Sequence, residues 1–450
     1  MNRPKLLILF TLLFIVPGLW AQSRLTLAEA VATALEKNPT RKAAVFHQRA
    51  AAAGIGEFRA ALLPQISFTE SYLRGNDPVF VFGSKLRQQR FSAADFALNV
   101  LNTPTPFSNF ATRISGGWQI FDSGASWLRL AQGKQMSAAA QRRLERTEQQ
   151  LVYRVIEAYT GVLLAQKQSQ VAEEAVQTSQ AIQERSQARF EAGMVVESDP
   201  LGAQVEHAAR QQELIQARNA VEIARASLNR ELGVALTTAY EPAEVLAERT
   251  LPIPSEAELE TLAVERRPDL ADATLQSDIQ RRNVTVAKAA FGPQVNVFAG
   301  WEADNPNLSG GGGNNWMAGV EVKVDLFSGG AKVARLKRER ALAEEARWQR
   351  EAMLSGVRLE VRQAFLDLDA ARQQVEVARG SVAQSKESLR IHQNRYEGGL
   401  TTLSDLLRAE EAALRAETGY WQAVYRVHIR YANLELAAGT LDANSPVVKP

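Results

Sequence analysis

The chain has 450 residues and a nearly balanced charge, with 52 lysine and arginine residues against 50 aspartate and glutamate residues. This balance offers no electrostatic footprint for nucleic acid. The chain has no cysteine, which excludes disulfides, thiolate metal sites, thiol nucleophiles and a lipidated N-terminal cysteine.

Residues 1–21 have the pattern of a secretory signal peptide. Two basic residues, Arg3 and Lys5, precede an eleven-residue apolar run, and cleavage is expected after Ala21. The run is shorter than the ~20 apolar residues that a spanning helix needs. We therefore expect an exported mature chain that begins near Gln22. No later apolar run approaches spanning length, but membrane-spanning strands carry a weaker signal and are not excluded.

Two copies of one long unit make up the chain. Residues 189–201 and 395–407 share six residues in register: Arg189, Glu191, Gly193, Ser198, Asp199 and Leu201 recur 206 positions later. Upstream the offset becomes 229, because RAALLPQ at 59–65 aligns with KAAFGPQ at 288–294, so the first copy carries 23 extra residues. Each unit is far longer than a solenoid repeat of roughly 20 to 50 residues. The sequence therefore indicates one large unit used twice.

Further helix is expected near the start of each copy, over residues 26–63 and 256–292. Ser255 and Glu258 have the spacing of a capping box. Between the copies, the proline-containing residues 234–255 indicate an irregular connector. The predicted organisation is a first repeat over 22–233, the connector over 234–255, a second repeat over 256–439 and a C-terminal tail over 440–450.

Each copy should also contain a pair of strands, within residues 64–121 and 293–327. Apolar residues alternate with polar ones in four runs: Ile66, Phe68 and Tyr72; Ile114, Trp118 and Ile120; Val295, Val297, Ala299 and Trp301; Trp316, Ala318, Val320 and Val322. Alternation over about ten residues with aromatics near one end is typical of an outer-membrane strand. Alternation alone also fits a half-exposed soluble sheet. The flexible turn DNPNLSGGGGNN at 304–315 and the flanking long helices favour the membrane sheet.

Four strands cannot close a membrane sheet by themselves. A sheet in lipid must have no open edges, and even the smallest barrels need about eight strands. The chain must therefore close a barrel with copies of itself.

A long helical hairpin follows each strand pair, over residues 125–232 and 331–438. Residues 125–192 contain no proline, and a heptad stripe that starts at Leu151 recurs 206 residues later at Val357. A 3.5-residue period supercoils helices against their neighbours. Taken alone, the stripe favours an ordinary antiparallel coiled coil.

The turn of each hairpin is expected at a glycine. Gly193 and Gly399 should close the long helices in the left-handed conformation. The second helix should begin near Ser198 and Asp199, or near Asp405 in the second copy, because these are cap-type residues.

Together these features resemble the TolC family of outer-membrane efflux and secretion ducts, over about residues 24–440. The motifs are LTLAEAVATALEKNP at 25–39, the two PQ junctions, QIFDSGA and DLFSGGA before the long helices, the RF/YE-x-G tips, and LNRELG ending at Gly233. No single motif is specific, but their order, repeated twice, is highly specific.

The resemblance implies a mainly α fold in a homotrimer. Four strands per chain would form one twelve-stranded outer-membrane barrel, and the helices would form a periplasmic α-barrel with residues 234–255 and the tail as a belt. The tips would meet a periplasmic adaptor (membrane fusion) protein and an inner-membrane transporter. The chain would be a passive duct of a tripartite efflux pump or type I secretion system, not an enzyme, and would bind no cofactor.

A competing class is a periplasmic coiled-coil adaptor or structural protein. That class predicts one hairpin per chain, flanked by compact β modules. Two hairpins with a strand pair in each half argue against it.

The extra residues of the first copy lie in the loop between the first two strands, roughly 75–111, which the resemblance places outside the cell. The loop contains Lys85, Arg87, Arg90 and several aromatics. A surface lid is one interpretation, and a solvated variable loop is the favoured one.

The resemblance places Asp199 and Asp405 at the periplasmic constriction. In a trimer Asp405 would form a ring of three carboxylates, and such rings select for cations. The alternative role is a helix N-cap, and both can hold. Tyr396 matches a tyrosine that helps lock the closed state, but Thr401 replaces its arginine partner, and Arg408 stands where a second acidic residue is found.

Gly193, Met194, Gly399 and Leu400 match the tip positions that family adaptors contact. The alternative is that each pair is only a turn glycine followed by a hydrophobic staple residue. The four histidines, His47, His207, His392 and His428, are scattered without ligand spacing, so no metal site is expected. No Ser-His-Asp or paired-carboxylate pattern indicates catalysis.

Overall fold

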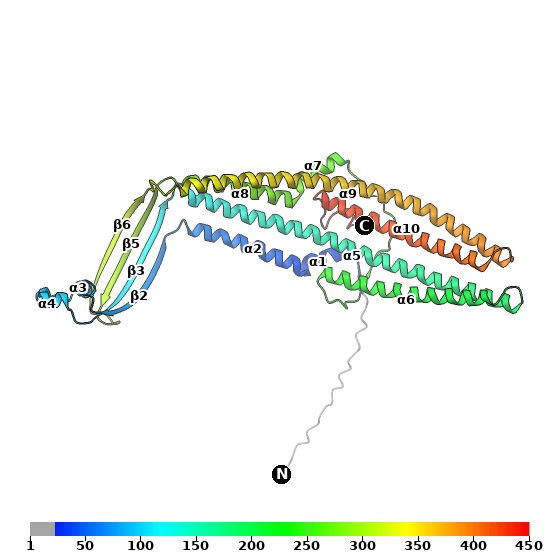
Figure 1. Cartoon of the computed structure of the whole chain (residues 1–450), viewed down its shortest axis with the longest axis horizontal. Coiled ribbons are helices and arrows are strands. Elements are labelled where there is room, and N and C mark those ends of the chain that lie inside the picture. Colours follow the sequence, from blue (N-terminus) through cyan, green and yellow to red (C-terminus); the bar gives the residue numbers. More distant parts are fainter. Residues whose placement is uncertain (1–22, 250, 450) are drawn as a thin grey trace, which may run out of the picture.

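The computed structural model describes residues 23–249 and 251–449. The predicted signal peptide over 1–21 and a mature start at Gln22 lie outside these residues. The described chain is elongated, with a four-stranded sheet at one end and the turns of two helical hairpins at the other (Figure 1). None of the described helices combines the length and the apolar character that crossing a membrane requires.

The same order of elements occurs twice. The first copy contains α1 (Leu27–Lys37), α2 (Pro39–Ala60), β2 (Gln65–Gly75), β3 (Phe107–Phe121), α5 (Ala125–Glu191) and α6 (Ser198–Leu232). The second contains α7 (Glu256–Arg266), α8 (Pro268–Ala289), β5 (Gln294–Asn305), β6 (Gly313–Lys323), α9 (Ala331–Glu397) and α10 (Leu403–Ala437). The predicted strand pairs and hairpins are therefore present.

Two regions contain structure that the sequence did not predict. The loop between β2 and β3 contains α3 (Pro78–Arg87), the 3₁₀-helix η1 (Ala93–Phe96) and α4 (Leu98–Asn102). The connector contains β4 (Tyr240–Pro242), which pairs in parallel with β1 (Ser23–Leu25). The predicted helices at 26–63 and 256–292 are each two helices, because Pro39 and Pro268 begin a new helix.

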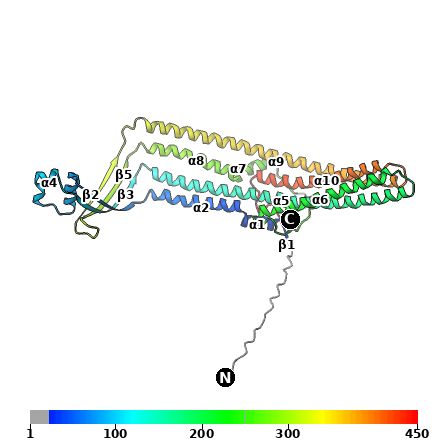
Figure 2. The same ribbon diagram turned by 60° about the horizontal axis from the view of Figure 1, so that its bottom comes forward.

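The helices form one curved layer. Next to the sheet, α2, α5, α8 and α9 lie side by side in the order of the strands that they adjoin (Figures 1 and 2). Towards the hairpin turns, α6 pairs with α5, and α10 contacts both α5 and α9. The heptad stripe forms the core where these helices meet, as predicted, because Leu151, Val155 and Val162 are buried together with Val357, Val361 and Leu368.

Four glycines end the four hairpin helices in the same way. Gly193, Gly233, Gly399 and Gly439 have φ between 71° and 73°, in the left-handed region. At each one the next residue donates its N–H to the carbonyl five positions earlier, as in Met194 to Arg189 at 2.9 Å. This is the Schellman motif, and it confirms the prediction for Gly193 and Gly399.

At one pair of matching positions the two copies make the same contact with different side chains. In the first copy Asn38 Nδ2 donates to the Glu231 carbonyl at 2.8 Å. At the matching positions of the second copy, Arg267 Nη1 donates to the Ala437 carbonyl at 3.3 Å. Both contacts fasten the last turn of a hairpin helix to the start of α2 or α8.

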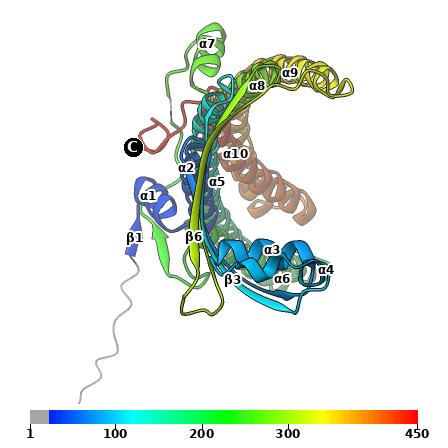
Figure 3. The ribbon, with the colours of Figure 1, turned by 90° about the vertical axis from the view of Figure 1, so that its left-hand side faces the viewer.

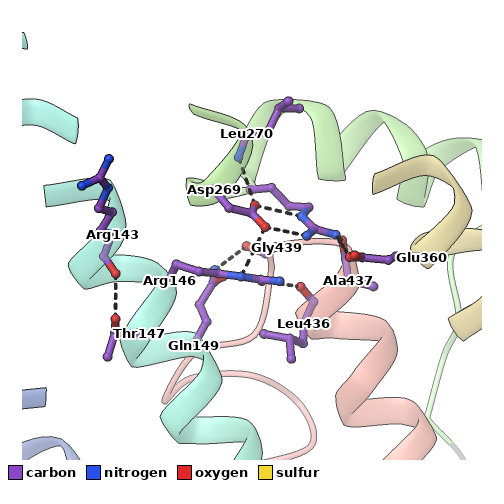
Figure 4. Close-up of polar contacts among 11 residues, drawn as sticks. Arg143, Arg146, Thr147, Gln149, Asp269, Leu270, Glu360, Leu436, Ala437 and Gly439 are labelled. Carbon is purple, nitrogen blue, oxygen red and sulfur yellow. Dashed lines mark hydrogen bonds and ion pairs between the residues drawn. The ribbon is translucent and has the colours of Figure 1, made fainter. Parts of the chain in front are cut away.

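The second-copy version is an ionic network around the buried Arg267 (Figure 4). Arg267 is 3% exposed and pairs with Asp269 at 2.6 Å and with Glu360 at 2.5 Å. Arg146 of α5 donates to the Leu436 carbonyl at 3.1 Å and lies 3.5 Å from Asp269. Because these residues come from α5, α8, α9 and α10, the network joins the two repeats halfway along the molecule.

The sheet has the order β2-β3-β5-β6, and every pair is antiparallel. Opposed residues lie on the same face, so pairs such as Trp301 with Trp316 and Val297 with Val320 form an apolar face. That face is uncovered in the single chain, since Ile66 and Trp316 are each 77% exposed. Glu70 interrupts the face and accepts a hydrogen bond from Thr112 across the pair at 2.6 Å.

The opposite face of the sheet is mainly polar, although it also contains Leu73, Phe298 and Met317. It contains Ser67, Thr69, Ser71, Asn109, Arg113, Ser115, Asn296, Glu302, Asp304, Asn315 and Glu321. Arg113 and Glu302, opposed across β3 and β5, form an ion pair at 2.9 Å. The outer strands β2 and β6 each have one neighbour, so the sheet has two open edges.

Candidate functional site at the hairpin tips

The two hairpin turns lie together at the end of the molecule opposite the sheet (Figure 1). At these turns Gly193 and Gly399 are each followed by an apolar side chain, and Met194 and Leu400 are 69% and 71% exposed. Nothing lies within 4 Å of where a Cβ on Gly193 would be, whereas one on Gly399 would meet Arg189 at 3.4 Å. The four residues predicted to contact an adaptor thus have the conformation of turn residues and are open to a partner.

Asp405 belongs to a capping box at the start of α10. The Asp405 N–H donates to Thr402 Oγ1 at 3.2 Å, and its carboxylate accepts from the Thr402 and Thr401 hydroxyls at 2.7 and 3.2 Å. The Thr402 side-chain and backbone donors hold the pKa of Asp405 below its usual range, with a smaller contribution from Arg408 at 3.7 Å. The cap residue is Thr402, not Asp405 as the alternative prediction had it; the aspartate is its partner three residues on.

Asp199 is not the structural equivalent of Asp405. Val196 occupies the position of Thr402 in the first copy and has no hydroxyl to cap the helix. The α6 helix follows Glu197, whose side chain makes no capping hydrogen bond. Within the described part of the chain, no hydrogen bond joins Asp199 to Tyr396 or Asp405.

Tyr396 is held by the first hairpin. Its side chain is 3% exposed, and its hydroxyl donates to Ser186 at 3.4 Å. The Arg189 guanidinium lies 4.9 Å from the centre of the ring and donates to the Tyr396 carbonyl and, at 3.1 Å, to the Glu397 carbonyl. Arg185 pairs with Glu397 at 2.6 Å. An arginine therefore does contact Tyr396, but it belongs to the first hairpin and not to position 401.

The sequence prediction missed Arg189. Its only signal was its place in the duplicated tip motif, where Arg395 is its counterpart. Around it, a small apolar cluster takes residues from all four hairpin helices: Ile182, Ala203, Tyr396, Leu403 and Leu406. The two hairpins of one chain therefore pack as a single unit at their tips.

A charged cluster lies between α6 and α10, further along the hairpins from the tips. The buried Arg210 pairs with Glu206 at 2.5 Å and with Glu213 and Glu411 at 2.7 Å. Glu410 is 4% exposed, and neither carboxylate oxygen has a hydrogen-bond partner. Burial raises the pKa of Glu410 to about 7, and the nearby Glu206 and Glu411 charges raise it against the opposing effect of Arg210.

The histidines make isolated contacts. His207 hydrogen-bonds with Ser179 at 3.1 Å, and His428 lies against the Ala247 carbonyl at 2.8 Å. Among residues 23–249 and 251–449, no group of three or more histidine, aspartate or glutamate side chains is arranged to hold a metal ion.

Comparison with known proteins places the chain in a family. The outer membrane efflux protein family matches residues 30–234 and 259–440. Alkaline protease secretion protein AprF of Pseudomonas aeruginosa is 26% identical over 414 residues, covering 91% of this chain and 83% of that protein. Outer membrane protein TolC of Vibrio cholerae is 25% identical over 434 residues, covering 94% and 92%.

Solved structures share the fold. The Campylobacter jejuni CmeC outer membrane channel aligns with a TM-score of 0.79 at 19% identity, over 94% of this chain and 88% of that one. The two family matches contain both repeats and both tips, with Asp199 in the first match and Tyr396 and Asp405 in the second. The chain therefore belongs to the outer membrane efflux protein family, the family of TolC.

Proposed function

We propose that three copies of this chain assemble into a passive exit duct across the outer membrane and the periplasm. The observation that carries the proposal is the sheet: one face is apolar and uncovered, the other is polar, and both edges are open. An open-edged sheet in lipid leaves backbone groups without partners, so β6 of one copy would pair with β2 of the next. Twelve strands would then close, with the apolar face on lipid and the polar face on the channel.

The helices support the same assembly. The curved layer of α2, α5, α8 and α9 continues from the strands in the same order, so closing the sheet would also close the helices into a tube. The 234–255 connector, the β1–β4 pair and the tail would form a belt around it. Residues 22–233 and 256–439 would then act as two similar wall segments per chain.

As a member of its family, the chain is an outer-membrane channel component of an efflux or type I secretion system. Its relatives are named both for protease secretion and for efflux, as in AprF and the Brucella suis outer membrane efflux protein BepC. We propose that the energy comes from an inner-membrane transporter and that a periplasmic adaptor engages Gly193, Met194, Gly399 and Leu400. The duct itself would carry out no chemical step.

The tips would close the periplasmic end. In the trimer, Asp405 would be repeated around the axis as a ring of carboxylates, with Asp199 nearby and Tyr396 holding the second hairpin against the first. Arg189 supports this role for Tyr396, because it links the two hairpins through the ring and two carbonyls.

Membrane fractionation with native mass spectrometry tests the proposal. We expect the mature chain in the outer-membrane fraction and a trimer in detergent that forms channels in planar bilayers. A stable monomer, or recovery from the soluble periplasm, would contradict the duct and favour the coiled-coil adaptor.

A further inference from the structure

The segment between β2 and β3, residues 76–106, is a small folded unit, here called the insert. Its aromatic rings pack edge to face, Phe82 on Phe91 at 4.8 Å and Phe91 on Phe96 at 5.1 Å between centroids. Lys85 pairs with Asp95 at 2.6 Å, and this contact, with the Ser92 backbone and hydroxyl donors, lowers the pKa of Asp95 to about 2. The insert is thus a folded unit, where the sequence favoured a loop.

Buried polar contacts fasten the insert to the polar face of the sheet. Gln88, at the end of α3, is 1% exposed and donates to the Ser108 carbonyl at 2.9 Å and to Asn109 Oδ1 at 2.8 Å. Asn109 in turn donates to Asp304, which is fully buried. Hydrogen bonds in such a buried chain fix the position of the groups that they join.

Two further contacts reach β5 and β6. Arg87 pairs with Glu302 on the polar face at 3.2 Å. On β6, a Cβ at Gly313 would lie 2.5 Å from the Arg87 carbonyl, so the glycine permits a close approach of the two backbones. The insert therefore closes over three strands at once, not over its own hairpin alone.

Figure 3, a view along the long axis of the molecule, shows to which side the insert projects. There α3 and α4 project to the side towards which the ends of α6 and α10 also extend. The β1 strand, α1 and the C-terminus lie on the opposite side. In the proposed duct the polar face lines the channel, so the insert would extend from the wall into the channel at its outer end.

The insert carries apolar side chains that nothing in the single chain covers. Val79, Phe96 and Leu98 are 80%, 65% and 76% exposed, and Leu86 is 49% exposed. Exposed large apolar side chains on one small folded unit offer apolar area that another surface can cover. The three cations of the insert, Lys85, Arg87 and Arg90, nearly balance the two acids, Asp77 and Asp95, so copies of the insert would not repel one another strongly.

We propose that the insert is a lid at the outer mouth of the duct, and that its apolar surface packs against the same surface of the neighbouring copies. The inference rests on the proposed trimer, whose three-fold axis would lie on the side to which the insert projects. Three inserts would then narrow or close the exit around that axis. The hydrogen bonds of Gln88, Asn109 and Asp304 would hold each lid in the inward position.

A cross-linking experiment tests the contact between copies. Because the chain has no cysteine, Leu98→Cys introduces a single thiol, and a short bis-maleimide should link protomers within purified trimers. Leu308→Cys is the matched control: it is 74% exposed in the β5–β6 loop, outside the insert, and should give little linkage. Equal linkage at both positions, or none at Leu98→Cys in intact trimers, would overturn the lid contact.

Conductance tests the closing role independently. Phe96→Asp with Leu98→Asp places three pairs of like charges between the lids. Measured together with Arg189→Ala, which loosens the periplasmic tips, it should raise single-channel conductance at least about twofold over Arg189→Ala alone, because the lid is then the section that limits the current. Leu308→Asp in the same background should leave it unchanged. Trimers with unchanged conductance and no linkage would refute the lid while leaving the duct intact, whereas loss of trimers in the unmodified chain would refute both. Loss of membrane retention in the Asp variants alone would show that the insert touches lipid instead.

Discussion

Arg189 of the first hairpin lies over the ring of Tyr396 of the second, 4.9 Å from its centre, and donates to the backbone carbonyl of the same residue. The guanidinium thus binds one tyrosine through both its ring and its main chain. A contact with the ring face contributes about 0.5 to 2 kcal/mol. Because the partners belong to different repeats, this contact resists separation of the two hairpins.

Arg189→Ala should therefore loosen the closed tips. We expect a higher resting conductance and a lower barrier to adaptor engagement, with the trimer intact. Tyr396→Phe keeps the ring and the carbonyl and removes only the 3.4 Å contact with Ser186, so its effect should be much smaller. Single-channel recording of both variants decides this, and a larger change for Tyr396→Phe would assign closure to the hydroxyl instead.

The duplication made much of the fold predictable. Matching glycines, heptad stripes and alternating strands occur twice, so each copy supported the prediction for the other, and all four strands and both hairpins are present. The tip contacts were harder to predict, because Arg189 and Tyr396 are 207 residues apart and no local spacing relates them.

Three other features were missed for separate physical reasons. Thr402 caps α10 because the helix begins one residue before the conspicuous pair of Ser404 and Asp405, and the residue that precedes its first turn supplies the hydroxyl. Glu410 looks like any other charge on a helix that is rich in charges, and its burial follows only from the packing of α6 on α10. The insert is fastened by contacts with β5 and β6, more than 200 residues away, so its own sequence favoured a loop.

The two roles of Asp405, as partner of the Thr402 cap and as a member of a carboxylate ring, can be tested with two different variants. Thr402→Ala removes the cap hydroxyl and keeps the carboxylate, so it should destabilise the helix start by about 1 kcal/mol and leave ion selectivity unchanged. Asp405→Asn keeps an acceptor but removes the charge, so it should lower the preference for cations.

The pH dependence of selectivity follows from the same contacts. The Thr402 donors lower the pKa of Asp405, so the carboxylate stays charged until the pH falls below the ordinary range for aspartate. Cation preference should persist down to that range, as read from reversal potentials in asymmetric salt. If Asp405→Asn leaves the reversal potential unchanged at every pH, the residue acts as a cap partner and the selective ring lies elsewhere.

Glu410 should make the hairpins less stable as the pH rises. Its pKa is raised from 4.5 to about 7 in the folded chain, so the folded state binds a proton that the unfolded state has released. Glu410 does not affect the free energy of unfolding below pH 4.5. As the pH rises from 4.5 towards 7, the free energy of unfolding falls by at most about 3 kcal/mol per chain, at 1.36 kcal/mol per pKa unit.

Glu410→Gln removes this titration and should stabilise the protein by about 1 to 2 kcal/mol at pH 8 and hardly at all at pH 4. Glu213→Gln is the matched control, because its carboxylate is 50% exposed although it also pairs with Arg210. Thermal unfolding of the detergent-solubilised trimer at both pH values measures the difference. An equal gain at pH 4 would show that the effect comes from packing and not from the charge.

Gly439 joins the end of α10 to the ionic network around Arg267, and its conformation leaves no room for a side chain. Its φ is 72°, and a Cβ there would lie 2.9 Å from Arg267. Gly439→Ala should therefore destabilise the protein, by about 1 to 3 kcal/mol for the left-handed backbone alone. Gly419→Ala lies in the interior of the same helix with nothing within 4 Å of its Cβ, so it should stabilise by about 0.5 to 1 kcal/mol. Thermal unfolding of both variants should therefore show changes of opposite sign. That difference separates the requirement of the turn at Gly439 from a general effect of glycine in α10. A stabilising Gly439→Ala would contradict the tight junction with Arg267.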